Sequence, residues 1–517
     1  MRTLRLMALF VVVSLATRVL ALQVDVLDMD ETVYAVAGAR LLEGGRLYVD
    51  VTDHKPPLVF VFYALVKLLL GGSLAAVRLV VVVAVVPLTA LALSAFYRHD
   101  RCGLMAALLY LCYGAAFLAH DMLAANCEVL LLLPATWAVV MVRDEADVRS
   151  PLRGFLSGLL LGIATLFKYQ AALWLPVPAA AALLARGARR GGAARFLAAL
   201  SAGFGLPLAA AFAHFQVGGA GDAFLYWNLT YNFAYTANPI DTVEALERFA
   251  SYLVPFALVS LPLFLGWRRS FAIYASPHQA LVVSSLVWLS LPAAFLGFRF
   301  YPHYFVQVLP PLALAAAPAA AELLGRPRSR PAVLALVHAV AVLFGFTALN
   351  AWLYGGEAEV YVEARPVYRQ VAARLATDAC REGASLFVWG HAPAFYYATG
   401  LPPASRFLLV ETSLTGYVPG NRASRSSATT ATAASGRVEP RHWDWLMDDL
   451  ERNRATYVLD TTRSGIHGWE SFPVSAYPRL SRYLASGFER VDAVGGVEIW
   501  RRRGCARGAE ETATSRP

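Results

Sequence analysis

The stretch LDMDETVYAVAGARLLEGGRLYVDVTDHKPPL, residues 27–58, separates two long apolar runs and decides how the chain folds. It opens with an acidic pair, Asp30-Glu31, at the start of a helical stretch that we expect to run to about Leu42. Acids at a helix N-terminus are stabilised by about 0.3–1 kcal/mol, which is the simplest reason for the pair. The alternative is a carboxylate that removes a proton from an acceptor group at a membrane surface.

The same stretch ends in His54-Lys55-Pro56-Pro57. Two prolines fix the backbone and start a helix without needing their missing N–H groups, so they explain the apolar segment 58–70 that follows. They do not explain the lysine. Lys55 either contacts lipid headgroups or holds a phosphate and neutralises its charge.

The composition is that of a membrane protein. Of 517 residues, 58% are hydrophobic and 16% are charged, whereas soluble proteins are about one quarter charged. Apolar runs long enough for a bilayer span recur through the first two thirds of the chain. The net charge of +9 comes from arginines in short clusters between these runs, which does not fit a nucleic-acid partner.

We expect a mainly α, polytopic helical bundle with about eleven spans. The first span is an uncleaved helix, because Arg18 interrupts its end and many apolar runs follow. The spans are placed near residues 4–23, 74–96, 103–119, 124–142, 154–168, 171–185, 196–216, 249–266, 280–298, 304–324 and 332–352.

The arginine clusters predict the orientation. They fall in alternate loops, which the positive-inside rule assigns to the cytoplasm together with the N-terminus. The alternation works only if residues 58–70 do not cross, and thirteen residues suit an interfacial juxtamembrane helix better than a span. The protein is therefore expected to be a multi-pass protein of the cytoplasmic membrane.

The opposite, extracytoplasmic face collects ionisable residues from separate loops. Such residues at membrane depth are costly and by default indicate function. Lysines at helix ends also reach the interface to be solvated, and polar pairs also hydrogen-bond helices together, so these readings stay open. Beyond the first loop the candidates are Asp121, Asn126 and Glu128 near one hairpin, Lys168 at a helix end, and Arg299, Tyr301 and His303 in RFYPHYF, residues 299–305.

From residue 353 to 517 the composition changes to that of a soluble α/β domain, so residues 1–352 form the transmembrane domain. We expect helices at 365–381 and 440–453, strands at 385–389, 456–460 and 497–502, and a mobile Ser/Thr/Ala-rich loop at 421–437. Cys380 and Cys505 could pair if this domain is extracytoplasmic. The domain is either a lid that binds the acceptor or a stabilising cap.

These motifs, in this order and on one side, resemble those of bacterial membrane glycosyltransferases related to protein O-mannosyltransferases and to the aminoarabinose transferase that modifies lipid A. The matching features are Asp30-Glu31, HKPPL at 54–58, Asn126-x-Glu128, Lys168, and RFYPHYF before Pro310-Pro311. The tail sequence 388–407 is also similar. The likeness covers most of residues 1–410 and implies the C-type membrane glycosyltransferase fold.

The resemblance implies a sugar donor linked to polyprenyl phosphate, reacting with inversion at the outer membrane surface. Asp30 would be the general base with Glu31 supporting it, and Lys55, Arg299 and Lys168 would bind the donor phosphate. The family's aminoarabinose transferases have an acid where this chain has His54, so a divalent metal stays open, with His54, Glu128 and His303 as candidate ligands. Further substrate contacts are expected from His54, Tyr34, Asp121, Asn126, Glu128, Tyr301 and His303.

The acceptor is an envelope glycan, a lipid or a protein. Two other classes of protein remain alternatives: a flippase or transporter of lipid-linked glycans, and an oligosaccharide ligase or polymerase. A transporter site is expected near the membrane midplane, whereas these residues gather at one surface. The expected partners are the polyprenyl-phosphate donor and membrane lipid.

Overall fold

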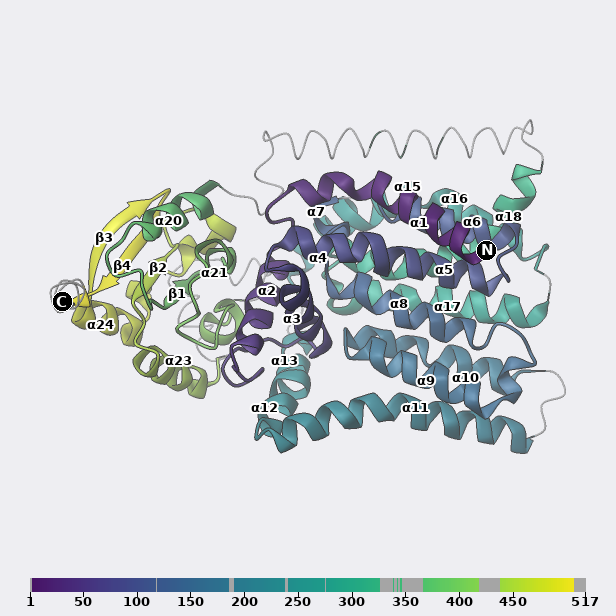
Figure 1. The fold of residues 1–517 in the computed structure, drawn as a ribbon, viewed down its shortest axis with the longest axis horizontal. Coiled ribbons are helices and arrows are strands. Elements are labelled where there is room, and N and C mark those ends of the chain that lie inside the picture. Colours follow the sequence, from purple (N-terminus) through teal and green to yellow (C-terminus); the bar gives the residue numbers. More distant parts are fainter. Residues whose placement is uncertain are drawn as a thin grey trace.

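The computed structural model describes residues 2–117, 119–185, 190–237, 240–274, 276–325, 366–417 and 438–505, together with residues 338, 342 and 345. Figure 1 shows a bundle of roughly parallel and antiparallel helices and, beyond one end of it, a smaller part that contains a sheet. The predicted span at 332–352 and the predicted boundary at 352/353 lie outside the described residues.

The helical part contains helices of widely different lengths. They are α1 (Arg2–Arg18), α2 (Met29–Leu42), α3 (Leu58–Leu70), α4 (Leu74–Val80), α5 (Val86–Phe96), α6 (Arg101–Tyr113), α7 (Ala119–Met122), α8 (Cys127–Val140), α9 (Pro151–Thr165), α10 (Pro176–Leu183), α11 (Arg190–Val217), α12 (Gly221–Leu225), α13 (Tyr231–Ala237), α14 (Thr242–Arg248), α15 (Val254–Val259), α16 (Leu261–Ser270), α17 (Pro277–Phe295) and α18 (Leu309–Leu324). Helices α2 and α3 lie at the end of the bundle nearest the sheet-containing part (Figure 1).

Five helices in the described part of the chain are long and apolar enough to cross a membrane. A sixth results if Thr242–Val259 and Leu261–Ser270 form one span, although these helices are bent by 51° against each other. This bend breaks the predicted span 249–266, because Pro262 follows the break and cannot continue the hydrogen bonds of the preceding helix. The number of spans therefore stays a prediction, while the helical bundle is confirmed.

Helix α3 begins and ends at the same end of the bundle, as its length predicted. Helix α1 runs antiparallel to α4 and α5, since Arg2 donates to the His99 carbonyl and Ser14 to the Val82 carbonyl. The chain between α1 and α4 must then leave and re-enter the bundle on one side. Helix α3 ends at Gly71, whose φ of +89° favours glycine.

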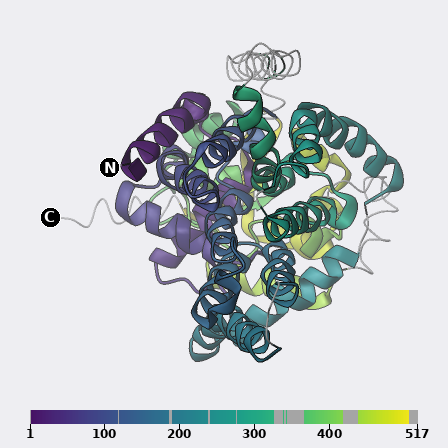
Figure 2. The same cartoon turned by 90° about the vertical axis from the view of Figure 1, so that its right-hand side faces the viewer.

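Two of the arginine-containing loops meet at the other end, which we call the arginine end. Arg98 pairs with Asp144 at 2.6 Å, and the Arg143 side chain donates to the Ala95 carbonyl at 3.0 Å. Figure 2 views the molecule from this side, where the N-terminus lies. The loops that carry Arg98 and Arg143 are thus together, as the arginine pattern predicts.

The C-terminal part contains a four-stranded mixed sheet in the order β1-β2-β4-β3. Strands β1 and β2 are parallel, with Leu386 opposite Tyr457, and β4 runs antiparallel to both β2 and β3. The predicted strands at 385–389, 456–460 and 497–502 are confirmed, whereas β3 was not predicted. The elements are α20 (Pro366–Ala376), β1 (Leu386–Trp389), α21 (Ala394–Thr399), α23 (Pro440–Arg452), β2 (Tyr457–Asp460), α24 (Pro478–Gly487), β3 (Phe488–Val494) and β4 (Val497–Arg502).

A disulfide joins Cys380 to Cys505, 125 residues apart, as the sequence suggested. It covalently links the segment after α20, near the start of the sheet-containing part, to the segment after β4, the last strand of the sheet. The predicted mobile loop at 421–437 lies outside the described residues.

The C-terminal part is held against the helical part by specific contacts. The Thr52 amide donates to the Arg406 carbonyl at 2.9 Å, and the Leu74 amide donates to the Tyr397 hydroxyl at 3.1 Å. The Tyr226 hydroxyl lies 2.8 Å from Nε2 of His442. These contacts place the sheet-containing part over the end of the bundle opposite the arginine end (Figure 1).

Candidate active site

Helix α2 presents Asp30 at the end of the bundle opposite the arginine end. Asp28 caps this helix, because its Oδ1 accepts the Asp30 amide at 2.9 Å. The Asp30 carboxylate lies 3.1 Å from the Lys55 ammonium and accepts a 3.1 Å hydrogen bond from the Tyr34 hydroxyl, one helical turn further on. The predicted helix from Asp30 to Leu42 is confirmed.

Glu31, the next residue, points away from Asp30 into the protein. Its side chain is 0% exposed, and the guanidinium of Arg78 on α4, 1% exposed, holds it with two hydrogen bonds of 2.9 and 2.6 Å. Backbone amides of Leu27 and Ala125 donate to the same carboxylate. Glu31 therefore fixes the start of α2 and has no free edge for a substrate.

Lys55 lies in the turn that precedes α3. Asp53 shapes this turn by accepting the Lys55 amide at 2.9 Å, and its Oδ2 lies 4.0 Å from the ammonium. The Tyr48 hydroxyl donates to the Lys55 carbonyl at 2.8 Å. Lys55 also lies 5.1 Å from the centre of the Tyr34 ring, so one ammonium contacts two carboxylates and an aromatic face.

His54 and Arg299 meet across a tyrosine of α13. The His54 ring lies 4.8 Å from the Tyr235 ring, and the Arg299 guanidinium lies 4.1 Å from the centre of the same ring. Tyr235 thus connects Arg299 to His54, the residue that precedes Lys55. A second cationic residue in this part of the protein suits a phosphate, which arginine binds in bidentate fashion.

A second group of charges comes from α8 and from the segment after α9. Glu128 lies in the first turn of α8 and pairs with Lys168. Lys168 has an extended backbone, with φ −158° and ψ 135°, between two helical segments, and this break presents its side chain to the bundle end. Its ammonium also lies 4.2 Å from the centre of the Tyr304 ring.

The RFYPHYF segment brings His303 between these two groups. Phe298, just before this segment, and Phe300, within it, have positive φ values of 52° and 47°, a conformation that costs of order 1–3 kcal/mol per residue and often marks functional segments. His303 Nδ1 pairs with Asp121 and lies 3.9 Å from Asp28, while its Nε2 lies 3.7 Å from Glu128.

Asn126 and Tyr301 complete this second group. The Asn126 amide donates to Asp28 Oδ2 at 2.7 Å, which connects α8 to the cap of α2. The Tyr301 ring stacks on His303 with centroids 5.5 Å apart and lies 4.7 Å from the Arg248 guanidinium. The two groups share Asp28, so apart from Glu31 the candidate residues form one continuous polar cluster.

A divalent cation fits three residues of this cluster. One ligand atom each from Asp28, Asp121 and His303 lies within 4.8 Å of the others, and carboxylate with imidazole is a donor set for such metals. Of the three ligands considered from the sequence, His303 belongs to this set, and in the described part of the chain His54 and Glu128 do not.

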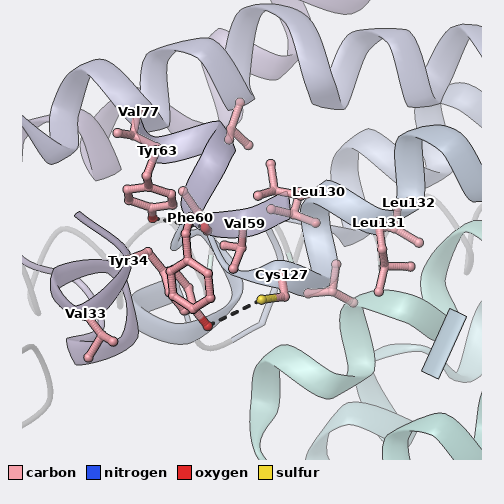
Figure 3. Close-up of a cluster of buried hydrophobic side chains, with 14 of the residues drawn as sticks. Val33, Tyr34, Val59, Phe60, Tyr63, Val77, Cys127, Leu130, Leu131 and Leu132 are labelled. Carbon is pink, nitrogen blue, oxygen red and sulfur yellow. Dashed lines mark hydrogen bonds between the residues drawn. The ribbon is translucent and has the colours of Figure 1, made fainter. Parts of the chain in front are cut away.

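The polar cluster lies against a packed layer of apolar side chains from α2, α3 and α8. Figure 3 shows Tyr34, Phe60 and Tyr63 between α2 and α3, with Cys127 and Leu130 of α8 beside them. The Tyr34 ring lies edge-on to Phe60 and Tyr63, and its hydroxyl accepts a 3.4 Å hydrogen bond from the Cys127 thiol. Tyr34 thereby orients Asp30 from a rigid base.

Sequence reasoning missed Asp28 and Asp53 as members of the site. Each stands two residues before a candidate, and each accepts the backbone amide of that candidate. This Asx-type spacing, Asp-x-Asp and Asp-x-Lys, was the available signal. Tyr235 and Tyr304 gave no signal of their own, because tyrosine at a membrane interface is ordinary.

The charges around Asp30 set its protonation. Burial alone would raise the pKa of its carboxyl, but the charges of Lys55 and His303 outweigh burial and hold the pKa well below its ordinary range. Burial lowers the pKa of His54 to about 4, although Asp53 opposes this. At neutral pH Asp30 is therefore an anion and His54 is neutral.

Comparisons with known proteins bear on the family and the fold. Residues 54–214 match the family model of dolichyl-phosphate-mannose-protein mannosyltransferases, a segment that includes Lys55, Asp121, Glu128 and Lys168. No curated protein sequence matches the chain.

Two solved structures are similar over nearly the whole chain. ArnT from Cupriavidus metallidurans bound to undecaprenyl phosphate is 16% identical, with a TM-score of 0.58, and the match covers 96% of this chain and 98% of that one. The archaeal oligosaccharyltransferase AglB from Archaeoglobus fulgidus, in complex with an inhibitory peptide and a dolichol-phosphate, is 11% identical, with a TM-score of 0.55 and coverages of 97% and 74%. The chain therefore has the C-type membrane glycosyltransferase fold, and about a third of it matches the mannosyltransferase family model.

Proposed function

We propose that this protein transfers a sugar from a polyprenyl-phosphate-linked donor to an acceptor at the outer face of the cytoplasmic membrane. The observation that carries the proposal is the contact of Asp30 with Lys55 at 3.1 Å, at the end of an apolar bundle. A carboxylate next to a phosphate-binding cation is what an inverting transfer from a sugar phosphate needs. The matched family and the lipid phosphates named with ArnT and AglB support this donor class.

The reaction is a single displacement. Asp30 takes the proton of the acceptor group, the acceptor atom forms a bond to the anomeric carbon, and the bond from that carbon to the phosphate oxygen breaks. Polyprenyl phosphate leaves with the electron pair and needs no proton, so one carboxylate suffices. Lys55 and Arg299 stabilise the charge that develops on the phosphate, and inversion follows from the single attack.

The Asp30–Lys55 contact implies that the donor activates the base. While Lys55 neutralises Asp30, the carboxylate is a weak base, because its pKa is held low. A donor phosphate competes for the same ammonium and draws it away from Asp30. The basicity of Asp30 then rises only when the donor is in place, which disfavours proton removal in its absence.

The second group plays a supporting part in this scheme. Lys168 adds positive charge near the phosphate, as does His303 when it holds no metal, and Tyr301 and Tyr304 offer ring faces to a sugar or an isoprenoid chain. A divalent cation bound by Asp28, Asp121 and His303 would supply additional charge neutralisation. Glu31 acts by positioning Asp30 and does not contact the substrate.

The orientation is supported by two independent features. The arginine end gathers two of the basic loops, as cytoplasmic ends do. The Cys380–Cys505 disulfide lies in the C-terminal part, and disulfides persist in oxidising compartments outside the cytoplasm. Both features support the proposed position of the candidate active site at the outer surface.

The reaction class is tested with a panel of polyprenyl-phosphate monosaccharides. We expect the purified protein, reconstituted with envelope extract as acceptor source, to release polyprenyl phosphate from one member of the panel. The released lipid is quantified by chromatography. Release only from diphosphate-linked oligosaccharides would instead identify an oligosaccharide ligase, and movement of lipid-linked glycan across vesicles without release would identify a transporter.

Replacing Lys55 by methionine should both slow the reaction and shift its pH dependence. Without the ammonium, burial raises the pKa of Asp30, so the carboxylate is lost at a higher pH than in the wild type. We expect the residual turnover of Lys55→Met to fall more steeply than wild-type turnover as the pH decreases from about 8 to about 5. Parallel pH profiles would contradict the coupling, and Arg46→Met, on the exposed part of the same loop, is the control.

A further inference from the structure

Lysine is rare in this chain and is confined to one end of the bundle. Only three of the 45 basic residues are lysines, at positions 55, 67 and 168. Lys55 and Lys168 pair with carboxylates of the candidate active site. Lys67, near the end of α3, has no carboxylate partner among the described residues and instead lines a cavity.

The cavity lies between α2, α3 and α21, and therefore between the helical bundle and the C-terminal part (Figure 1). Its charged lining residues are Arg40, Glu43 and Lys67. Arg40 pairs with Glu43 at 2.7 Å through one terminal nitrogen, while its buried Nε has no hydrogen-bond partner in the described part of the chain. The lining thus carries an excess of positive charge and an unused donor.

The size of the cavity selects a small group. Its volume is about 150 Å³, whereas pockets for drug-sized ligands measure roughly 300–1,000 Å³. A phosphate or a similar head group fits this space, and a glycan does not. Arginine and lysine are the residues that bind phosphate oxygens through charge-assisted hydrogen bonds.

The outer surface of α3 explains how such a group would arrive. Leu65, Leu68 and Leu69 on this helix are 51%, 65% and 75% exposed. In a membrane protein an exposed apolar face of an interfacial helix contacts acyl chains. A lipid whose chains lie on these leucines has its head group at the level of Lys67, the residue that precedes two of them.

We propose that this cavity binds the phosphate head group of a membrane lipid at a site separate from the donor site. Arg40 follows Asp30 by ten residues on α2, a distance of about 15 Å along the helix. Bound there, the phosphate joins α2 and α3 to α21 and so holds the C-terminal part against the bundle. A free phosphate ion presents the same oxygen atoms to Arg40 and Lys67.

The test measures binding of short-chain phosphatidic acid to the full-length protein in a zwitterionic detergent by isothermal titration calorimetry. We expect Lys67→Gln and Arg40→Gln each to weaken binding by about tenfold, the effect of losing one charge-assisted contact. Arg46→Gln, which removes an exposed arginine of the same loop that pairs with Asp50, is the matched control and should bind as the wild type does. Equal affinities for all four proteins would overturn the proposal.

Two further arms separate the sources of the phosphate. With a lipid ligand, Leu69→Ser should weaken phosphatidic acid binding without changing the weaker binding of inorganic phosphate. If inorganic phosphate binds as tightly as the lipid and Leu69→Ser has no effect, the lipid assignment is overturned. Short-chain phosphatidylcholine, whose head group has no net charge, should bind weakly, and tight binding that is insensitive to Lys67→Gln would overturn the phosphate assignment as well.

Discussion

Asp30→Asn should reduce turnover by about 10²–10⁴-fold, the range that a positioned general base contributes. Asparagine has the shape of aspartate and still accepts the hydrogen bond of Tyr34, so the local structure should persist. It cannot take the proton of the acceptor. The measurement is single-turnover release of polyprenyl phosphate from the donor identified in the panel, together with the affinity of the variant for polyprenyl phosphate.

The affinity for polyprenyl phosphate separates two roles of Asp30. If Asp30 is the base, binding is preserved or tightened, because Lys55 loses a competing partner. Asp50→Asn changes an aspartate of the same loop that pairs with the exposed Arg46, and this control should keep full activity. Wild-type turnover in Asp30→Asn would refute the assignment, whereas weakened lipid binding with normal chemistry would reduce Asp30 to a partner of Lys55.

Glu31→Gln should destabilise the fold by about 3–5 kcal/mol, which is the cost of leaving one member of a buried ion pair without its counter-charge. The amides of Leu27 and Ala125 donate to different oxygens of Glu31, and glutamine keeps one oxygen, so the change removes the charge that Arg78 requires and one of these two hydrogen bonds. Unfolding in detergent, followed by the fluorescence of the 11 tryptophans, measures the loss.

Two comparisons sharpen that result. Arg98→Gln breaks an ion pair at the exposed arginine end, where Arg98 is 69% exposed, and should cost at most about 1 kcal/mol. The double variant Glu31→Met with Arg78→Met removes both charges together and should recover part of the stability that Glu31→Gln loses. A Glu31→Gln protein as stable as Arg98→Gln would show that the buried pair contributes little.

The acidic pair in the first loop illustrates what a sequence can and cannot indicate. Asp30 and Lys55 could be selected because each stands out against an apolar, arginine-rich chain. The sequence also suggested that Asp30 and Glu31 act together, but neighbouring residues on a helix point in different directions. Asp30 faces the candidate active site, and Glu31 faces Arg78, 47 residues later in the chain.

More of the topology than of the side-chain contacts could be predicted from the sequence. Loop arginines and the length of segment 58–70 were enough to place α3 on one side of the bundle, since both depend only on composition and length. Asp28, Asp121 and His303 come close together because three distant segments pack against one another. Their spacing along the sequence does not predict this proximity. Strand β3 was missed because it alternates weakly and carries several charges.

The Glu31–Arg78 pair also bears on how the protein is made. Glu31 is synthesised 47 residues before Arg78, an interval of roughly 2–10 s at ordinary rates of translation. During that interval the carboxylate of Glu31 has no counter-charge, so it must remain solvated by water outside the bilayer. Only insertion of the span Leu74–Phe96 in the correct direction delivers Arg78 to the same side as Glu31. If this span is inverted, both charges are left without a partner, so the pair forms only when the span has been inserted correctly.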